Sequence, residues 1–133
     1  MGPQGQGSNS PHQRDEQFMR RARRIAQGFT AEEEGGGVSR TPLELRHEAL
    51  LVYEDPERGV QKAAMFGFFH GRNPEAVIVV ELYDDRTSVE LARLAAARVV
   101  VAGHGKNWQS EEGVGGSGSS YWAFSLPKEA GAD

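Results

Sequence analysis

The stretches LELRHEALLVYE (residues 43–54), VQKAAMFGFFH (60–70) and AVIVVELY (76–83) decide the fold of this chain. Each is rich in β-branched, aromatic or alternating apolar residues, which is typical of strands. Only residues 55–59 and 71–74 separate them, and connections this short join antiparallel neighbours, because a parallel crossover needs a dozen or more residues. The sequence therefore predicts an antiparallel meander, in which 76–83, apolar on both faces, is the most buried strand.

An amphipathic helix is predicted ahead of the meander, over residues 10–28. Ser10 and Gln13 form a capping box at its start. On the helical period one face is apolar and the opposite face is rich in arginine. The apolar residues are Phe18, Ala22, Ile25, Ala26 and Phe29. Three glutamates and three glycines follow, a composition typical of linkers, so residues 29–41 are predicted to tether the helix flexibly.

The segment after the meander is open to two interpretations. A capping box and a run of alanines favour a helix over 88–97, followed by a short strand over 98–102. The alternative is a strand throughout, because Val89, Leu91 and Arg93 also alternate.

The remaining segments complete an α+β domain over residues 42–127. Within it, 103–119 is predicted to be a glycine-rich loop and 121–126 a final strand. Residues 1–9 are predicted to be a disordered tail, and 128–133 a polar tail. The predicted fold class is a mainly antiparallel meander sheet with an N-terminal amphipathic helix and one further helix across the sheet, since an apolar sheet face needs cover.

The composition excludes several classes of chemistry. The 133 residues include no cysteine, which removes disulfides, thiol nucleophiles, iron–sulfur clusters and cysteine-type zinc sites. No apolar run is long enough to span a membrane, and the absence of cysteine favours a cytoplasmic location. The net charge is −4, yet residues 14–28 hold five arginines against two acidic residues, a net of +3, so the rest of the chain is acidic.

Residues 42–83 resemble a family of uncharacterised small bacterial domains. The matching pieces are LEL (43–45), LLVY (50–53), DPERG (55–59), GR (71–72) and ELY (81–83). That family has no assigned activity and no agreed catalytic residues. The resemblance therefore implies no function, cofactor or site residue for this chain.

Polar residues at predicted strand ends are the candidate catalytic groups, because loops beyond strand ends commonly carry sites on a rigid sheet. His70 ends one strand, Asp84 follows the next, and His104 opens the glycine-rich loop. If these three side chains converged, they could bind a metal and serve a small metal-dependent hydrolase. No two histidines have the spacing of a metal-binding pair, so ordinary sheet and turn histidines are the simpler interpretation, and no metal or cofactor is predicted.

Two candidate partner surfaces remain. Four helix arginines could bind nucleic-acid phosphates, although a solvated helix face is the simpler interpretation: Arg20, Arg21, Arg23 and Arg24. Four apolar side chains could contact a protein partner: Phe18, Ile25, Phe29 and Trp108. The leading hypothesis is a non-enzymatic binding or accessory module with a protein partner. The metal-dependent hydrolase and a nucleic-acid accessory protein are the alternatives.

Overall fold

The structure is a computed structural model that describes residues 10–34, 39–94, 97–110 and 121–127. One helix, one short 3₁₀ turn and nine strands are present in these ranges. In chain order they are α1 (Pro11–Gln27), β1 (Phe29–Glu34), β2 (Arg40–Leu45), β3 (Leu51–Asp55), η1 (Pro56–Arg58), β4 (Val60–His70), β5 (Asn73–Leu82), β6 (Arg86–Arg93), β7 (Arg98–Gly103), β8 (Lys106–Gln109) and β9 (Tyr121–Pro127). Both predicted tails, 1–9 and 128–133, lie outside the described residues.

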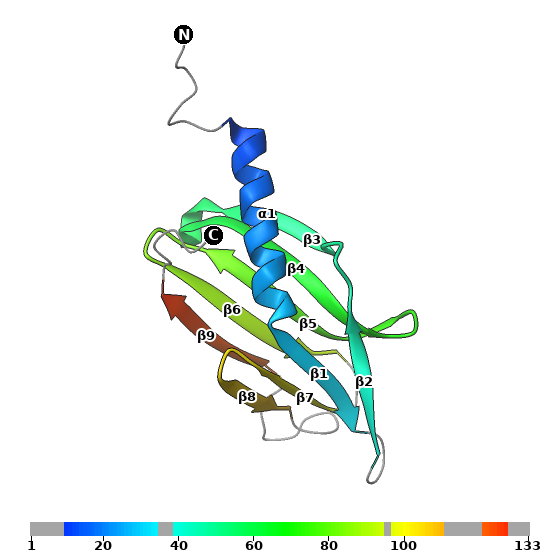
Figure 1. The fold of residues 1–133 in the computed structure, drawn as a ribbon. Helices are drawn as coiled ribbons and strands as arrows, with labels where there is room; N and C mark the ends of the chain where they lie inside the picture. Colours follow the sequence, from blue (N-terminus) through cyan, green and yellow to red (C-terminus); the bar gives the residue numbers. More distant parts are fainter. Residues whose placement is uncertain (1–9, 35–38, 95–96, 111–120, 128–133) are drawn as a thin grey trace.

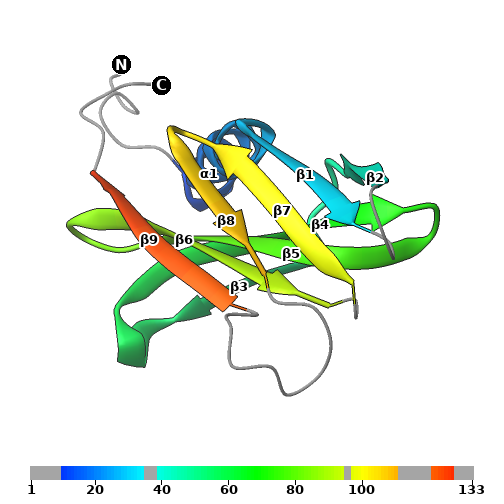
Figure 2. The same ribbon diagram turned by 90° about the horizontal axis from the view of Figure 1, so that it is seen from below.

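All strands belong to one antiparallel sheet with the order β8-β7-β1-β2-β4-β5-β6-β9, and β3 pairs with β4 beside β2. The predicted antiparallel meander is confirmed. Strand β4 matches the predicted range. Strand β5 has the longest run of consecutive buried residues, six from Ala76 to Glu81, although β4 has seven buried residues in all. The sheet curves strongly, so that its two ends, β8 and β9, lie on the same side of the molecule (Figure 2). The result is a nearly closed, barrel-like sheet.

The first predicted strand, 43–54, is divided. Leu45 pairs with Phe68 and Leu51 pairs with Met65, so six residue steps on one strand face three on the other. The extra residues leave the ladder between β2 and β3. This wide irregularity places two short strands on one edge of β4 instead of one long one.

The predicted helix over 88–97 is wrong for its described part, and the alternative of a strand is confirmed over Arg86–Arg93. Strand β6 pairs with β5 over seven residue pairs, and its buried residues alternate as Thr87, Val89 and Leu91. Helix propensity is a weak local preference, whereas a strand here satisfies the open edge of β5 and buries an apolar row. The predicted strand over 98–102 is confirmed as β7.

The predicted flexible linker and glycine-rich loop both contain strands. Strand β1 occupies the first six residues of the proposed linker and pairs with both β2 and β7. Strand β8 lies within the proposed loop and pairs with β7. Composition suggested solvent exposure at both places, but the period-two alternation within each short segment agrees with a strand.

Helix α1 packs on the concave face of the sheet, which makes it part of the core (Figure 1). Its predicted capping box is present, with Ser10 and Gln13 exchanging hydrogen bonds of 3.0 and 3.1 Å. Ala22 and Ala26 are fully buried, so the helix backbone lies close to the sheet. No second helix crosses the sheet in the described residues. Helix α1 covers the apolar sheet face that the second helix was predicted to cover. None of the helices described has the length and apolar character to span a membrane.

Candidate metal centre

The three consecutive glutamates of β1 do not share one environment. Strand geometry turns Glu32 and Glu34 to one face, where Arg40 bonds both, at 3.3 and 2.9 Å. Arg98 of β7 lies 3.5 Å from Glu34 as well. Glu33 turns to the opposite face, the concave face that also takes Phe29 and Ala31. Glu33 is therefore separated from the arginines that neutralise its neighbours.

Glu75 reaches the same region because of a bulge in β5. The register of β4 and β5 shifts between Phe68, which pairs with Ala76, and Phe69, which pairs with Pro74. One step on β4 thus faces two on β5, and Glu75 is the extra residue. A bulge redirects the side chain of its extra residue, and such irregularities are common next to binding sites.

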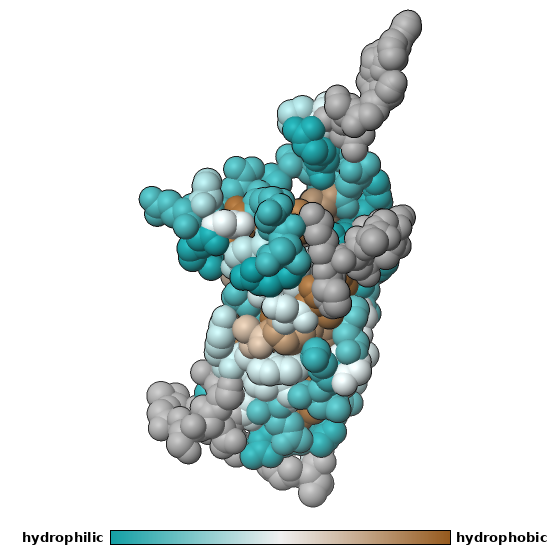
Figure 3. All heavy atoms as spheres, turned by 90° about the vertical axis from the view of Figure 1, so that its left-hand side faces the viewer, coloured by the Kyte–Doolittle hydropathy of each residue, from teal (hydrophilic) through white to brown (hydrophobic). Residues whose placement is uncertain are grey.

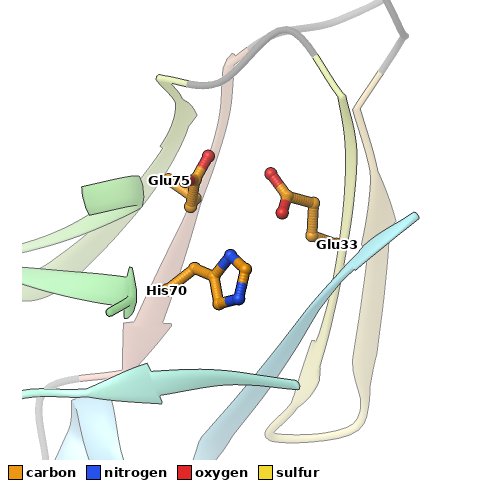
Figure 4. A group of neighbouring side chains, drawn as sticks. All are labelled: Glu33, His70 and Glu75. Carbon is orange, nitrogen blue, oxygen red and sulfur yellow. The ribbon is translucent and has the colours of Figure 1, made fainter. Parts of the chain in front are cut away.

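His70, the last residue of β4, completes the group. Figure 4 shows Glu33, His70 and Glu75 pointing toward one another from β1, β4 and β5. One ligand atom from each side chain lies within 4.8 Å of the other two. Three ligands of a tetrahedral ion at about 2.1 Å would be about 3.4 Å apart, so closing the site needs a contraction of at most about 1.4 Å.

The two carboxyl groups make this corner electrostatically unfavourable without a cation or proton. Burial, followed by the hydrogen bond to Glu33, raises the pKa of Glu75, while His70 acts in the opposite direction. The arginines that pair with Glu32 and Glu34 lie on the other face of β1. Like charges this close favour proton uptake or a bound cation.

The ligand set suits a divalent ion of intermediate hardness. Carboxylate oxygens are preferred by Mg²⁺, Ca²⁺ and Mn²⁺, whereas imidazole favours Zn²⁺ and other transition metals. One imidazole with two carboxylates therefore fits Zn²⁺ or Mn²⁺ best. His70 is exposed and Glu33 and Glu75 are half-buried, so solvent can reach the remaining coordination positions.

The structure does not bring His70, His104 and Asp84 together. His70 and Asp84 lie at opposite ends of the β4–β5 hairpin, because Asn73 pairs with His70 while Leu82 pairs with Lys62. The eight residues between these pairs span about 26 Å at the usual rise of a strand. The expected convergence of these three residues is therefore wrong, since antiparallel strand direction places consecutive strand ends on opposite sides of a sheet.

His104 has a structural role at the end of α1. Its Nε2 lies 2.9 Å from the carbonyl oxygen of Ile25, one of the last helix carbonyls, and its ring packs on Phe29 at 4.7 Å. His104 lies in the turn between β7 and β8, where its backbone has a positive φ of 51°. The same Ile25 carbonyl oxygen accepts from Gly28 N–H at 3.1 Å, so His104 adds a second contact at the end of the helix.

The side chains expected to contact a protein partner are in the core. All four are less than a tenth exposed: Phe18, Ile25, Phe29 and Trp108. They hold α1 and β8 against the sheet, so they offer no surface to a partner in this conformation. The apolar helix face that suggested recognition in the sequence is the face that the fold itself uses.

The helix arginines are divided between the fold and the surface. Arg21 Nη2 donates to Thr87 Oγ1 at 3.3 Å, and Arg23 Nε donates to the carbonyl oxygen of His47 at 3.0 Å. Arg20 and Arg24 are exposed. Nucleic-acid binding through these four residues stays a hypothesis, with two of them engaged in docking α1.

A second polar cluster, which the sequence analysis did not identify, lies on the convex face around Glu81. This carboxylate is 1% exposed and accepts bonds from Tyr53 Oη at 2.7 Å, Tyr83 Oη at 2.9 Å and Arg58 Nη2 at 3.0 Å. Burial would raise the pKa of Glu81, but these bonds outweigh it and lower the pKa. Burial, followed by the charge of Glu81, raises the pKa of nearby Glu90. Every bonding group of Glu81 is satisfied, so this cluster holds β3 and η1 to the sheet.

Comparison with known proteins gives no further guide. No family model, no curated protein and no solved structure matches this chain.

Proposed function

We propose that this protein is a binding module whose ligand is a divalent cation, held by Glu33, His70 and Glu75. The observation that carries the proposal is the convergence of two carboxylates and an imidazole within 4.8 Å from three strands. Two features support it further. The arginines that pair with Glu32 and Glu34 lie on the face of β1 opposite Glu33, and the β5 bulge adds Glu75 to the same corner as Glu33.

A cation here would also fasten two parts of the sheet. Glu33 lies on β1, whereas His70 and Glu75 lie beside the β4–β5 turn, with β2 between them in the strand order. A ligand that binds only the folded chain stabilises it by mass action, by about 2.7 kcal/mol at a hundredfold excess over the dissociation constant. Binding is therefore expected to appear as thermal stabilisation.

The test is calorimetric titration of untagged protein with ZnCl₂ and MnCl₂, together with thermal unfolding in each metal and in EDTA. We expect one saturable site and a higher melting temperature that EDTA reverses. His70→Gln should weaken binding at least tenfold, because it removes the only imidazole.

The matched control is His12→Gln. His12 also faces a carboxylate, with Nε2 3.3 Å from Glu16 Oε2, but it has no third ligand in the described residues. This variant should bind metal like the parent protein. Equal weakening by both variants, or no saturable binding of either metal, would contradict the proposal.

A small metal-dependent hydrolase is the second candidate, because three protein ligands leave coordination positions open for water and substrate, as in catalytic zinc sites. It would use His70 without His104 or Asp84. Metal-loaded protein would be assayed with p-nitrophenyl phosphate and p-nitrophenyl acetate. Turnover that is abolished both by EDTA and by His70→Gln would support a hydrolase. Metal binding without turnover would exclude the hydrolase and support the binding module.

A further inference from the structure

The two end strands of the sheet, β8 and β9, face each other across a seam without a hydrogen-bonded ladder. Successive antiparallel pairings around the sheet make β8 and β9 run in opposite directions, so their directions would permit a ladder. Figure 3, which looks at the side of the molecule on which β9 lies, shows apolar atoms at the surface between hydrophilic regions. In the described residues, side chains rather than backbone hydrogen bonds therefore join β8 to β9.

Side chains bridge the seam in one antiparallel register. Trp108 of β8 stacks on Trp122 of β9, with ring centroids 6.5 Å apart. Lys106 precedes Trp108 by two residues on β8, and Phe124 follows Trp122 by two residues on β9. Lys106 Nζ lies 5.1 Å from the centroid of the Phe124 ring. The four side chains thus form two cross-strand pairs on the concave face, and the aromatic ring of Phe29 adjoins Phe124 at 5.9 Å.

Among the described residues, two donors at this seam have no acceptor. Trp108 Nε1 is buried and has no hydrogen-bond partner in the part of the chain that the structure describes. Burying such a group without a partner is unfavourable, and exceptions in folded proteins call for an explanation. Lys106 has no ion pair among the described residues, whereas Lys62 is bound by both Asp15 and Glu54.

We infer that the β8–β9 seam binds the carboxylate group of an apolar carboxylic acid. Lys106 supplies the positive charge and Trp108 Nε1 donates a hydrogen bond, while Trp122, Phe124 and Phe29 contact the apolar body. Lys106 and Trp108 are two residues apart on one strand, so their side chains leave the same face. An apolar pocket with a few convergent polar groups is the usual form of a small-molecule site. The site is separate from Glu33, His70 and Glu75.

An acid fits these donors better than a neutral ligand. A carboxylate only accepts hydrogen bonds, and it offers two oxygens to two donors. A bond to a charged group is also stronger than one between neutral groups. The seam should therefore discriminate between an acid and the alcohol of the same chain length.

The two tryptophans of the sequence are both at the seam, so they report on it directly. Full-length ¹⁵N-labelled protein would be titrated with dodecanoate and, separately, with dodecan-1-ol. The two indole N–H resonances would be followed and assigned with Trp122→Phe. We expect the Trp108 resonance to move downfield and saturate with the acid, with the alcohol binding at least tenfold more weakly.

Lys106→Met, which keeps an unbranched side chain one atom shorter and removes the charge, should bring the affinity for dodecanoate down to that for dodecan-1-ol. Retained binding of the alcohol shows that the seam of this variant is intact. The control is Arg72→Met, which removes a positive charge from the exposed β4–β5 turn and should leave both affinities unchanged. An unmoved Trp108 resonance, equal binding of acid and alcohol, or no effect of Lys106→Met would overturn the inference.

Discussion

Trp108 and Trp122 stack at 6.5 Å with their ring planes 15° apart, across the seam between the two end strands. Elsewhere in the described sheet, neighbouring strands are joined by backbone ladders. At this seam aromatic side chains make the contact instead. Trp108 belongs to the hydrophobic core that also contains the buried face of α1, and Trp122 packs against that core. The seam is therefore continuous with the core of the fold.

Removing the ring of Trp108, the more buried of the two tryptophans, should destabilise the fold. Trp108→Ala is expected to lower the free energy of unfolding by about 3–5 kcal/mol, because it leaves a large cavity in the core. Trp108→Phe keeps an aromatic contact and removes the unpaired N–H, so it should cost less than about 1.5 kcal/mol. Urea unfolding followed by circular dichroism measures both. A loss below about 1 kcal/mol for Trp108→Ala would show that the ring contributes little to stability.

The Glu81 cluster should make stability fall in acid. The pKa of Glu81 is lowered in the folded chain, so its contribution is complete above about pH 4.3, the value for a free glutamate. It is lost as the pH falls through the lower folded pKa. Glu81→Gln should cost about 1–3 kcal/mol at pH 7, and less at pH 3. Urea unfolding at both pH values tests this.

Tyr53→Phe is the matched variant for that experiment. It removes one bond to Glu81 and leaves those from Arg58 and Tyr83, so about 1 kcal/mol is expected at pH 7. Burial, followed by the hydrogen bond to Glu81, raises the pKa of Tyr53 to about 12, so this hydroxyl stays protonated throughout. A pH-independent loss for Glu81→Gln would contradict the assignment.

The effect of Glu75→Gln on stability should change sign when metal is bound. The folded chain raises the pKa of Glu75, so its contribution to stability is present below about pH 4.3 and is lost as the pH rises through the folded pKa. In EDTA at pH 7 the variant should therefore be more stable than the parent protein, and the difference should vanish near pH 4. With saturating Zn²⁺ the order should reverse, because a ligand is missing.

Thermal unfolding of the two proteins under the three conditions measures this prediction. A variant that is less stable than the parent in EDTA at pH 7 would mean that Glu33 and Glu75 do not repel each other. The same order with and without Zn²⁺ would mean that Glu75 is not a ligand.

Helix α1 should be required for folding. Ala22 is completely buried between the helix and the sheet, so Ala22→Asp places an unpaired charge in the core and should abolish cooperative unfolding. Arg20→Asp introduces the same side chain at an exposed position of the same helix and should unfold cooperatively. Thermal circular dichroism separates the two. Cooperative unfolding of a stable Ala22→Asp variant would contradict the docking of α1 and support the flexible tether predicted from the linker composition.

Sequence reasoning succeeded where the signal was local. The capping box of Ser10 placed the start of α1, and the short turns joined β4 to its neighbours in antiparallel order. It failed where partners far along the chain decided the outcome. The glutamates of β1 suggested a linker until Arg40 and Arg98 were found on the adjacent strands. The residues of β6 favoured a helix until β5 offered a ladder.

The candidate metal centre was beyond reach for the same reason, since only His70 was identified. Glu75 carries no sequence signal, because a bulge depends on the register between two strands. Glu33 was hidden in an acidic run whose alternation matters only once it forms a strand.

The sequence by itself determined the antiparallel order of the central strands, the amphipathic helix and the absence of cysteine chemistry, since these follow from neighbouring residues. Only the tertiary structure decided that the helix enters the core, that β8 and β9 meet through two tryptophans, and that Glu33, His70 and Glu75 converge. The physical reason is that curvature and register of a sheet arise from contacts between residues far apart in the chain.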